Sequence, residues 1–182
     1  MNKHLLVASL IPSLLAPLIA SAISLNELQS DPNRYIVIDE DKTYTIYIDS
    51  DSIESIRYYP PYYTMQVEVF FVSYPDSYIG DNLFTINYDY NHSAEDLIAK
   101  ALKEDLTRSY EDCMKYVYRE AMKNSGITFN TSSSVCYDFK GNYLSPVSPT
   151  SGDVRYYSPI FHVANYIFYK YYDDYFLPTN KF

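Results

Sequence analysis

The sequence has no tryptophan, only four glycines, two cysteines and three histidines among its 182 residues. So few glycines exclude a glycine-rich phosphate-binding loop. Of the three histidines only His92 and His162 lie beyond the N-terminal segment, and a lone histidine lacks the convergent partners that a catalytic or metal site needs. We therefore predict no cofactor, no bound metal and no enzyme activity.

Beyond the N-terminus the chain lacks any apolar run long enough to cross a bilayer. At the N-terminus, Lys3 and His4 precede an apolar stretch, and Ala20-Ser21-Ala22 then supplies small residues for cleavage. We predict a cleavable signal peptide over residues 1–22, with an uncleaved anchor as the alternative. No cysteine lies near the cleavage point, so a lipid anchor is not expected. The predicted location is secreted, periplasmic or cell-surface.

The remaining residues, 23–182, have the length of a single domain. The whole chain has 14 basic and 23 acidic residues and a net charge of −9, which becomes −10 once Lys3 is removed. Phosphate groups would be repelled by this charge, so nucleic acid and acidic lipid surfaces are poor partners. We expect a protein partner and no membrane insertion after cleavage.

Tyrosine is the residue that this chain has in excess, with 23 copies. Its ring packs while its hydroxyl stays hydrated or bonded, so most copies are expected in the core and on the sheet. The segment Tyr58-Tyr59-Pro60-Pro61-Tyr62-Tyr63 places four aromatic rings around a loop and is the best candidate for a partner-binding surface. The alternative is that these rings fold back onto the edge of the domain.

Alternating and helical periods along the chain predict an α+β fold, in which an antiparallel sheet of about six strands carries a long helix and a C-terminal helix. Ser93 and the Ser158-Pro159 pair have the residue types that begin helices. The long helix is predicted to break near Thr107-Arg108-Ser109. The predicted strands cover 34–39, 43–49, 53–59, 64–74, 83–90, 133–139 and 143–144, and the predicted helices cover 94–123 and 159–173.

The two cysteines, Cys113 and Cys136, form an even pair in a chain predicted to be exported. An oxidising compartment favours a disulfide between them, which would pin the long helix to the strand that carries Cys136. Two buried thiols, or a bridge from one of them to another chain, are the alternatives.

Acidic side chains cluster at Asp49, Asp51 and Glu54, with a spacing that could hold calcium. The spacing does not fit an EF-hand loop, and Asp and Ser commonly build turns by bonding to their own backbone. A turn is therefore the preferred interpretation. A pair of carboxylates for hydrolysis is not visible from the sequence, because such a pair is defined by its separation in space.

Several elements recur together in one known family: Tyr47–Ile53, the strand Thr64–Tyr74, the segment Tyr137–Asn142 and the helix that begins at Ser158-Pro159. With these elements the chain resembles the surface-adhesin protein E family of Gram-negative bacteria. The resemblance implies a small exported domain with an antiparallel sheet, a helix fixed by a disulfide, binding to host extracellular proteins and no enzyme activity. Family members commonly carry tryptophan in the early strands, and the segment 94–123 looks like an insertion. No binding residue carries over individually.

Three functions follow from these observations. The leading prediction is an exported, non-enzymatic binding module, a surface adhesin that contacts host extracellular matrix proteins. The alternative is a periplasmic structural or inhibitory protein that binds another envelope protein through its acidic surface. The third is a secreted hydrolase, which a deep polar cleft with perturbed carboxylates would favour.

Overall fold

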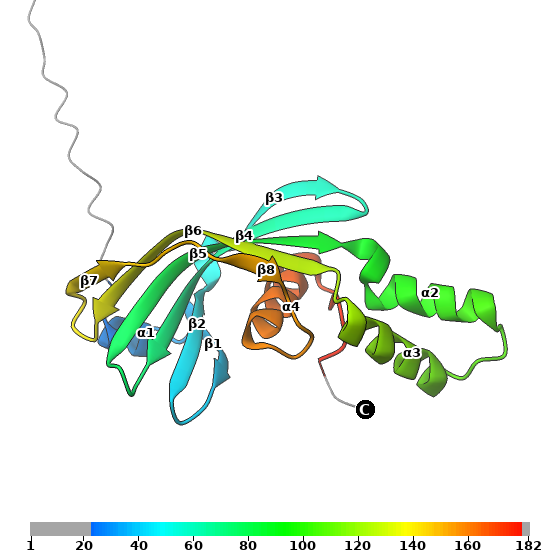
Figure 1. The fold of residues 1–182 in the computed structure, drawn as a ribbon, viewed down its shortest axis with the longest axis horizontal. Helices are drawn as coiled ribbons and strands as arrows, with labels where there is room; N and C mark the ends of the chain where they lie inside the picture. The colour runs from blue at the N-terminus through cyan, green and yellow to red at the C-terminus, as the bar shows by residue number, and fades with distance from the viewer. Residues whose placement is uncertain (1–22, 180–182) are drawn as a thin grey trace, which may run out of the picture.

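An antiparallel sheet with helices against it organises the chain in the computed structural model, which describes residues 23–179 (Figure 1). The predicted α+β class is confirmed. The predicted signal peptide, residues 1–22, lies outside the described residues. None of the helices within residues 23–179 is long and apolar enough to cross a membrane.

Eight strands form one sheet in the described part of the chain. Six of them follow the order β1-β2-β4-β5-β6-β7, while β3 pairs with β4 and β8 pairs with β6. The last strand, β8, lies in a segment that the sequence pattern predicts as loop. The bounds are β1 Tyr35–Glu40, β2 Tyr44–Asp49, β3 Glu54–Tyr59, β4 Tyr62–Ser73, β5 Tyr78–Asp89, β6 Ile127–Asp138, β7 Tyr143–Pro146 and β8 Ser151–Asp153.

Four α-helices accompany the sheet in residues 23–179: α1 Leu25–Ser30, α2 Ala94–Glu104, α3 Tyr110–Lys123 and α4 Pro159–Tyr172. Short 3-10 turns, η1 Ser50–Ser52 and η2 Tyr90–His92, lie at strand ends. The sequence pattern did not predict α1, whose N-terminus is held by a capping box between Ser24 and Glu27. The predicted helix over 94–123 is broken as expected, because Ser109 caps a new helix. The predicted caps Ser93 and Ser158 are confirmed.

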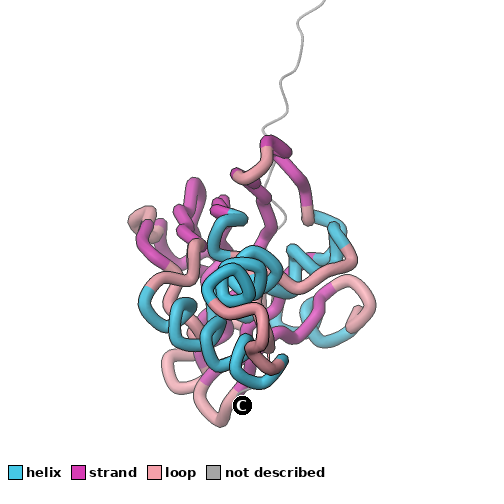
Figure 2. Tube along the Cα trace, turned by 90° about the vertical axis from the view of Figure 1, so that its right-hand side faces the viewer, coloured by secondary structure: helices cyan, strands magenta, loops and turns pink. Residues whose placement is uncertain are grey.

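The two faces of the sheet differ because side chains alternate along each strand. On β4, Met65, Val67 and Val69 are buried beneath α4 on one face. Gln66 and Glu68 lie on the opposite face, as the alternation predicts. Figure 2, seen from the side of α2 and α3, shows helices in front of the strands.

Two buried polar contacts fix α4 and the chain that follows it. The hydroxyl of Tyr88 on β5 donates to the carbonyl oxygen of Ala164 at 2.8 Å. The side chain of Asn165 donates to the carbonyl oxygen of Leu177 at 2.8 Å and accepts from the amide of Leu177 at 3.0 Å. Since buried polar groups are costly when unpaired, these bonds hold the helix in one position on the sheet.

The opposite face of the sheet is covered at one end only. There α1 inserts Leu28 into a second cluster that includes Phe70 and Ile79. Away from α1 this face carries polar cross-strand pairs. The hydroxyl of Thr64 donates to the side-chain oxygen of Asn87 at 2.9 Å, and the Gln66 amide donates to Thr85 at 3.0 Å. We call the polar part of this face the open face.

The acidic segment after β2 forms a turn, as preferred from the sequence. Asp49 is 2% exposed and accepts bonds of 3.0, 3.1 and 2.7 Å from the guanidinium of Arg34. The same carboxylate accepts from the amide of Asp51 at 3.0 Å and so caps η1. Among the described residues there is no group of three His, Cys, Asp or Glu side chains arranged to hold a metal ion.

The predicted disulfide between Cys113 and Cys136 is wrong for this structure, in which both are free cysteines. Cys113 lies in the first turn of α3, about 15 Å along the helix from its C-terminal end. Cys136 lies near the far end of β6, about 30 Å along the strand from its start. Since α3 and β6 extend in opposite directions from their connection (Figure 1), the two cysteines are far beyond the roughly 7 Å that a disulfide allows between Cα atoms.

Candidate functional site

The tyrosine-rich segment forms the tip of the β3–β4 hairpin, which rises away from the rest of the sheet in Figure 1. The turn consists of Pro60 and Pro61, joined by a cis peptide bond. Three of the four predicted tyrosines are exposed: Tyr58 by 67%, Tyr59 by 65% and Tyr62 by 48%. Such a projecting group of aromatic rings is a plain candidate for contact with a partner.

Tyr63 differs from its neighbours because it is only 8% exposed. Its ring centroid lies 5.5 Å from Tyr172 and 5.8 Å from Phe168, both on α4, and 5.3 Å from Tyr58. The prediction that Tyr63 binds a partner is therefore wrong, because its ring packs into the core. For this residue the alternative, in which the ring folds back onto the domain, is confirmed.

The base of the hairpin is fastened to α4. The hydroxyls of Ser55 and Tyr172 lie 3.0 Å apart and share a hydrogen bond. Together with the ring contacts of Tyr63, this bond joins the hairpin to the last turn of the helix. These contacts restrict the motion of the hairpin that carries the exposed tyrosines. Less conformational freedom is therefore lost when a partner binds.

Tyr59 and Tyr62 are directly opposite each other in the strand pair, on the side of the open face. The next residue on this side is Arg57, whose guanidinium carbon lies 5.4 Å from the ring centroid of Tyr59. Arg57 forms no ion pair within residues 23–179. Arg57 and Tyr62 also line a cavity of about 250 Å³ that extends to Thr64 and Asn87.

Sequence reasoning did not single out Arg57, Thr64 or Asn87. The alternation of side chains could have found them, because Arg57 and Thr64 are a cross-strand pair and Asn87 is opposite Thr64 on β5. Aromatic rings beside a guanidinium and an amide offer apolar area together with hydrogen bonds, which is the composition of protein-binding surfaces. We call Arg57, Tyr58, Tyr59 and Tyr62 the tyrosine tip.

A second, polar cavity of about 320 Å³ lies at the α1 end of the sheet, where Glu68 and Asp81 meet Arg34 and Tyr35. Burial, with a smaller contribution from the charge of Glu68, raises the pKa of Asp81 from 3.8 to about 6. The guanidinium of Arg34, in the same cavity, is paired with Asp49. A carboxyl that titrates near neutral pH inside a polar cavity is the feature that the hydrolase prediction requires.

No protein-family model, curated protein or solved structure matches this chain. The resemblance to the surface-adhesin protein E family therefore stays a prediction. The surface and the cavities described above are the observations from which function is inferred.

Replacing Tyr63 tests whether this residue stabilises the fold while its exposed neighbour Tyr62 does not. Tyr63→Ala should lower the free energy of unfolding by about 3 kcal/mol, because it removes a buried aromatic ring and leaves a cavity beside α4. Tyr62→Ala, the matched control one residue away, should change it by less than about 0.5 kcal/mol. Urea denaturation followed by far-UV circular dichroism measures both. Equal destabilisation by the two variants would contradict the assignment of opposite faces.

Asp81 should make stability depend on pH. Its raised pKa means that the native state binds more protons than the unfolded state between pH 3.8 and about 6, so this group's contribution to stability falls as pH rises through that range. Asp81→Asn removes the charge, and the variant should be roughly 2 to 3 kcal/mol more stable than the original protein at pH 7.5 and nearly equal to it at pH 4.

Denaturant titrations at the two pH values test this expectation for Asp81, and Asp153→Asn, an exposed carboxyl on β8, serves as the control. The expectation is contradicted if Asp81→Asn is less stable than the original protein at pH 7.5, or if the difference in stability between them is the same at both pH values. Either result would show that burial does not destabilise the ionised form of Asp81.

Proposed function

We propose that this chain is an exported, non-enzymatic binding module that contacts a protein partner through the tyrosine tip. The observation that carries the proposal is the exposure of three rings, Tyr58, Tyr59 and Tyr62, on one projecting hairpin. Tyrosine offers a large contact area with only two side-chain torsions to fix, so such rings bind at low entropic cost. The supported base of the hairpin lowers that cost further.

The partner that fits this surface is a host extracellular protein, which makes the chain a surface adhesin. Two observations support this choice: the resemblance to the adhesin family, and an aromatic rather than acidic character at the tip. Arg57 adds a positive charge there, although the chain as a whole is acidic, so a carboxylate on the partner would find an unpaired guanidinium. The alternative partner is another envelope protein, bound through the acidic surface of a periplasmic protein.

Removing the two open-face rings tests the proposal. The double variant Tyr59→Ala and Tyr62→Ala should lose at least about tenfold in affinity for the captured partner, since aromatic anchors at a contact centre typically cost 2 kcal/mol or more when truncated. The measurement is a pull-down of matrix proteins and of envelope extract with the purified domain, followed by titration of whatever partner is captured.

The control for this pull-down is the double variant Tyr110→Ala and Tyr143→Ala, which removes two rings exposed by 72% and 59% on other elements. The control should bind like the original protein. Equal losses in both variants would reject the tyrosine tip. Capture that disappears in high salt and comes only from the envelope extract would favour the periplasmic alternative over adhesion.

A second candidate function is hydrolysis at the polar cavity, favoured by Asp81 and its pKa of about 6. Asp81 would act as the proton donor and Glu68 as its partner carboxylate. If this function holds, the chain turns over a chromogenic glycoside, and Asp81→Asn abolishes turnover while raising stability. Absence of turnover in the original protein across a panel of such substrates would remove this candidate.

A further inference from the structure

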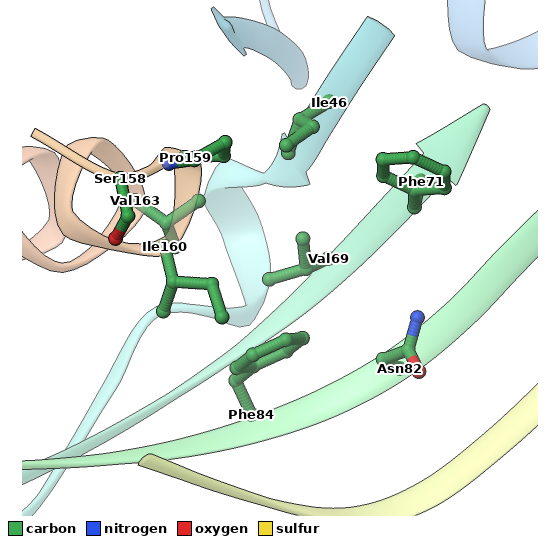
Figure 3. Close-up of a pocket in the computed structure, with 9 residues that line it drawn as sticks. All are labelled: Ile46, Val69, Phe71, Asn82, Phe84, Ser158, Pro159, Ile160 and Val163. Carbon is green, nitrogen blue, oxygen red and sulfur yellow. The ribbon is translucent and has the colours of Figure 1, made fainter. Parts of the chain in front are cut away.

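An apolar cavity of about 340 Å³ lies between the first turns of α4 and the strands β2, β4 and β5 (Figure 3). It is separate from the tyrosine tip and from the polar cavity, which is on the other face of the sheet. Its walls are aliphatic and phenyl side chains, and no charged side chain lines it. Figure 3 shows Val69 and Phe84 of the sheet on one side and Ile160 of α4 on the other.

The walls of this cavity are held by packing behind them. The ring of Phe71 stacks on Tyr44 with centroids 5.7 Å apart and an interplanar angle of 19°. The ring of Phe84 stacks on Phe129 at 5.5 Å and 26°. Ile46 and Val69 are buried and belong to the main core. The cavity is therefore preformed, as most small-molecule sites are.

The two polar residues at the cavity, Ser158 and Asn82, are both engaged in hydrogen bonds. The hydroxyl of Ser158 is used to cap α4, where it accepts from the amide of Phe161 at 3.2 Å. Asn82 donates one hydrogen bond to the carbonyl oxygen of Gly80 at 3.1 Å and accepts one from Ser134 at 2.7 Å. The surface that the cavity exposes is almost entirely apolar, so neither residue offers a polar atom to it. Figure 3 places Asn82 across the cavity from the α4 residues.

The cavity opens to solvent on one side, because Phe71, Phe84 and Ile160 in its wall are only partly buried. Concave, mostly apolar pockets of this size are the usual sites of small ligands. An apolar cavity of about 150 Å³ accepts benzene, so one of about 340 Å³ has room for a body of roughly two fused rings. A charged ligand is disfavoured because nothing in the wall compensates for its lost hydration.

We propose that this cavity binds an uncharged, apolar small molecule of about two fused rings. The stacked rings of Phe71 and Phe84, together with Ile160, form the walls that contact it. This site does not include the tyrosine tip, so its test does not depend on the proposed protein-binding function.

The probes are 1-naphthol, naphthalene and 1-naphthoate, titrated by calorimetry and by thermal shift. The original protein should bind 1-naphthol, with a rise in Tm that grows with ligand concentration, and 1-naphthoate at least about tenfold more weakly. Ile160→Trp, which fills the cavity, should reduce affinity for 1-naphthol at least about tenfold. Ile56→Trp is the matched control, because Ile56 is 49% exposed on β3, and it should leave affinity unchanged.

Comparing naphthalene with 1-naphthol gives a readout that loss of structure would not produce. Naphthalene should bind at least as tightly as 1-naphthol, because the cavity offers the hydroxyl no polar partner. The proposal is overturned if 1-naphthol does not bind up to its solubility limit, if Ile160→Trp binds it as tightly as the original protein, or if 1-naphthoate binds equally well.

Discussion

The pairing of β4 with β5 is the constraint on which the rest of this structure depends. Twelve residues pair without interruption, from Tyr62 opposite Asp89 to Ser73 opposite Tyr78. β2 and β3 attach to β4, and β6 attaches to β5. Because side chains alternate, this register decides which side chains meet α4 and which meet solvent. A shift of one residue would turn Met65 outward and place Gln66 beneath the helix.

The same register places the three candidate sites. Phe84 and Asn82 point to the α4 side of the sheet and line the apolar cavity. Asp81 directly precedes Asn82 on β5, so its side chain points to the opposite face and lines the polar cavity. At the end of β4, alternation brings Tyr62 to the surface and Tyr63 into the core. Burial of Asp81 opposes its charge, and shifted carboxyls of this kind cluster at functional sites. The apolar cavity differs from the polar one, because no charged side chain lines it.

Sequence reasoning predicted the features that depend on local pattern. The strands with clear alternation, the caps at Ser93 and Ser158, and the break between α2 and α3 are all readable over a few residues. It missed α1 and β8 because six and three residues are too few to show a period. It misplaced Tyr63 because it did not apply the alternation of buried side chains along β4 from Met65 back to the start of the strand, which would have placed Tyr63 in the core. The disulfide prediction failed because the number of cysteines says nothing about how far apart they lie in the fold. Here the distance between Cys113 and Cys136 is set by α3 and β6, which run in opposite directions from their connection.

The central claim is that the hairpin tip, rather than another exposed tyrosine, meets the partner. Site-resolved tyrosine nitration, read by mass spectrometry on the free domain and on the captured complex, tests it most directly. The account predicts that Tyr58, Tyr59 and Tyr62 react in the free domain and are protected in the complex, while Tyr110 and Tyr143 react in both. Protection of Tyr110 or Tyr143 with continued reaction at the hairpin would contradict it.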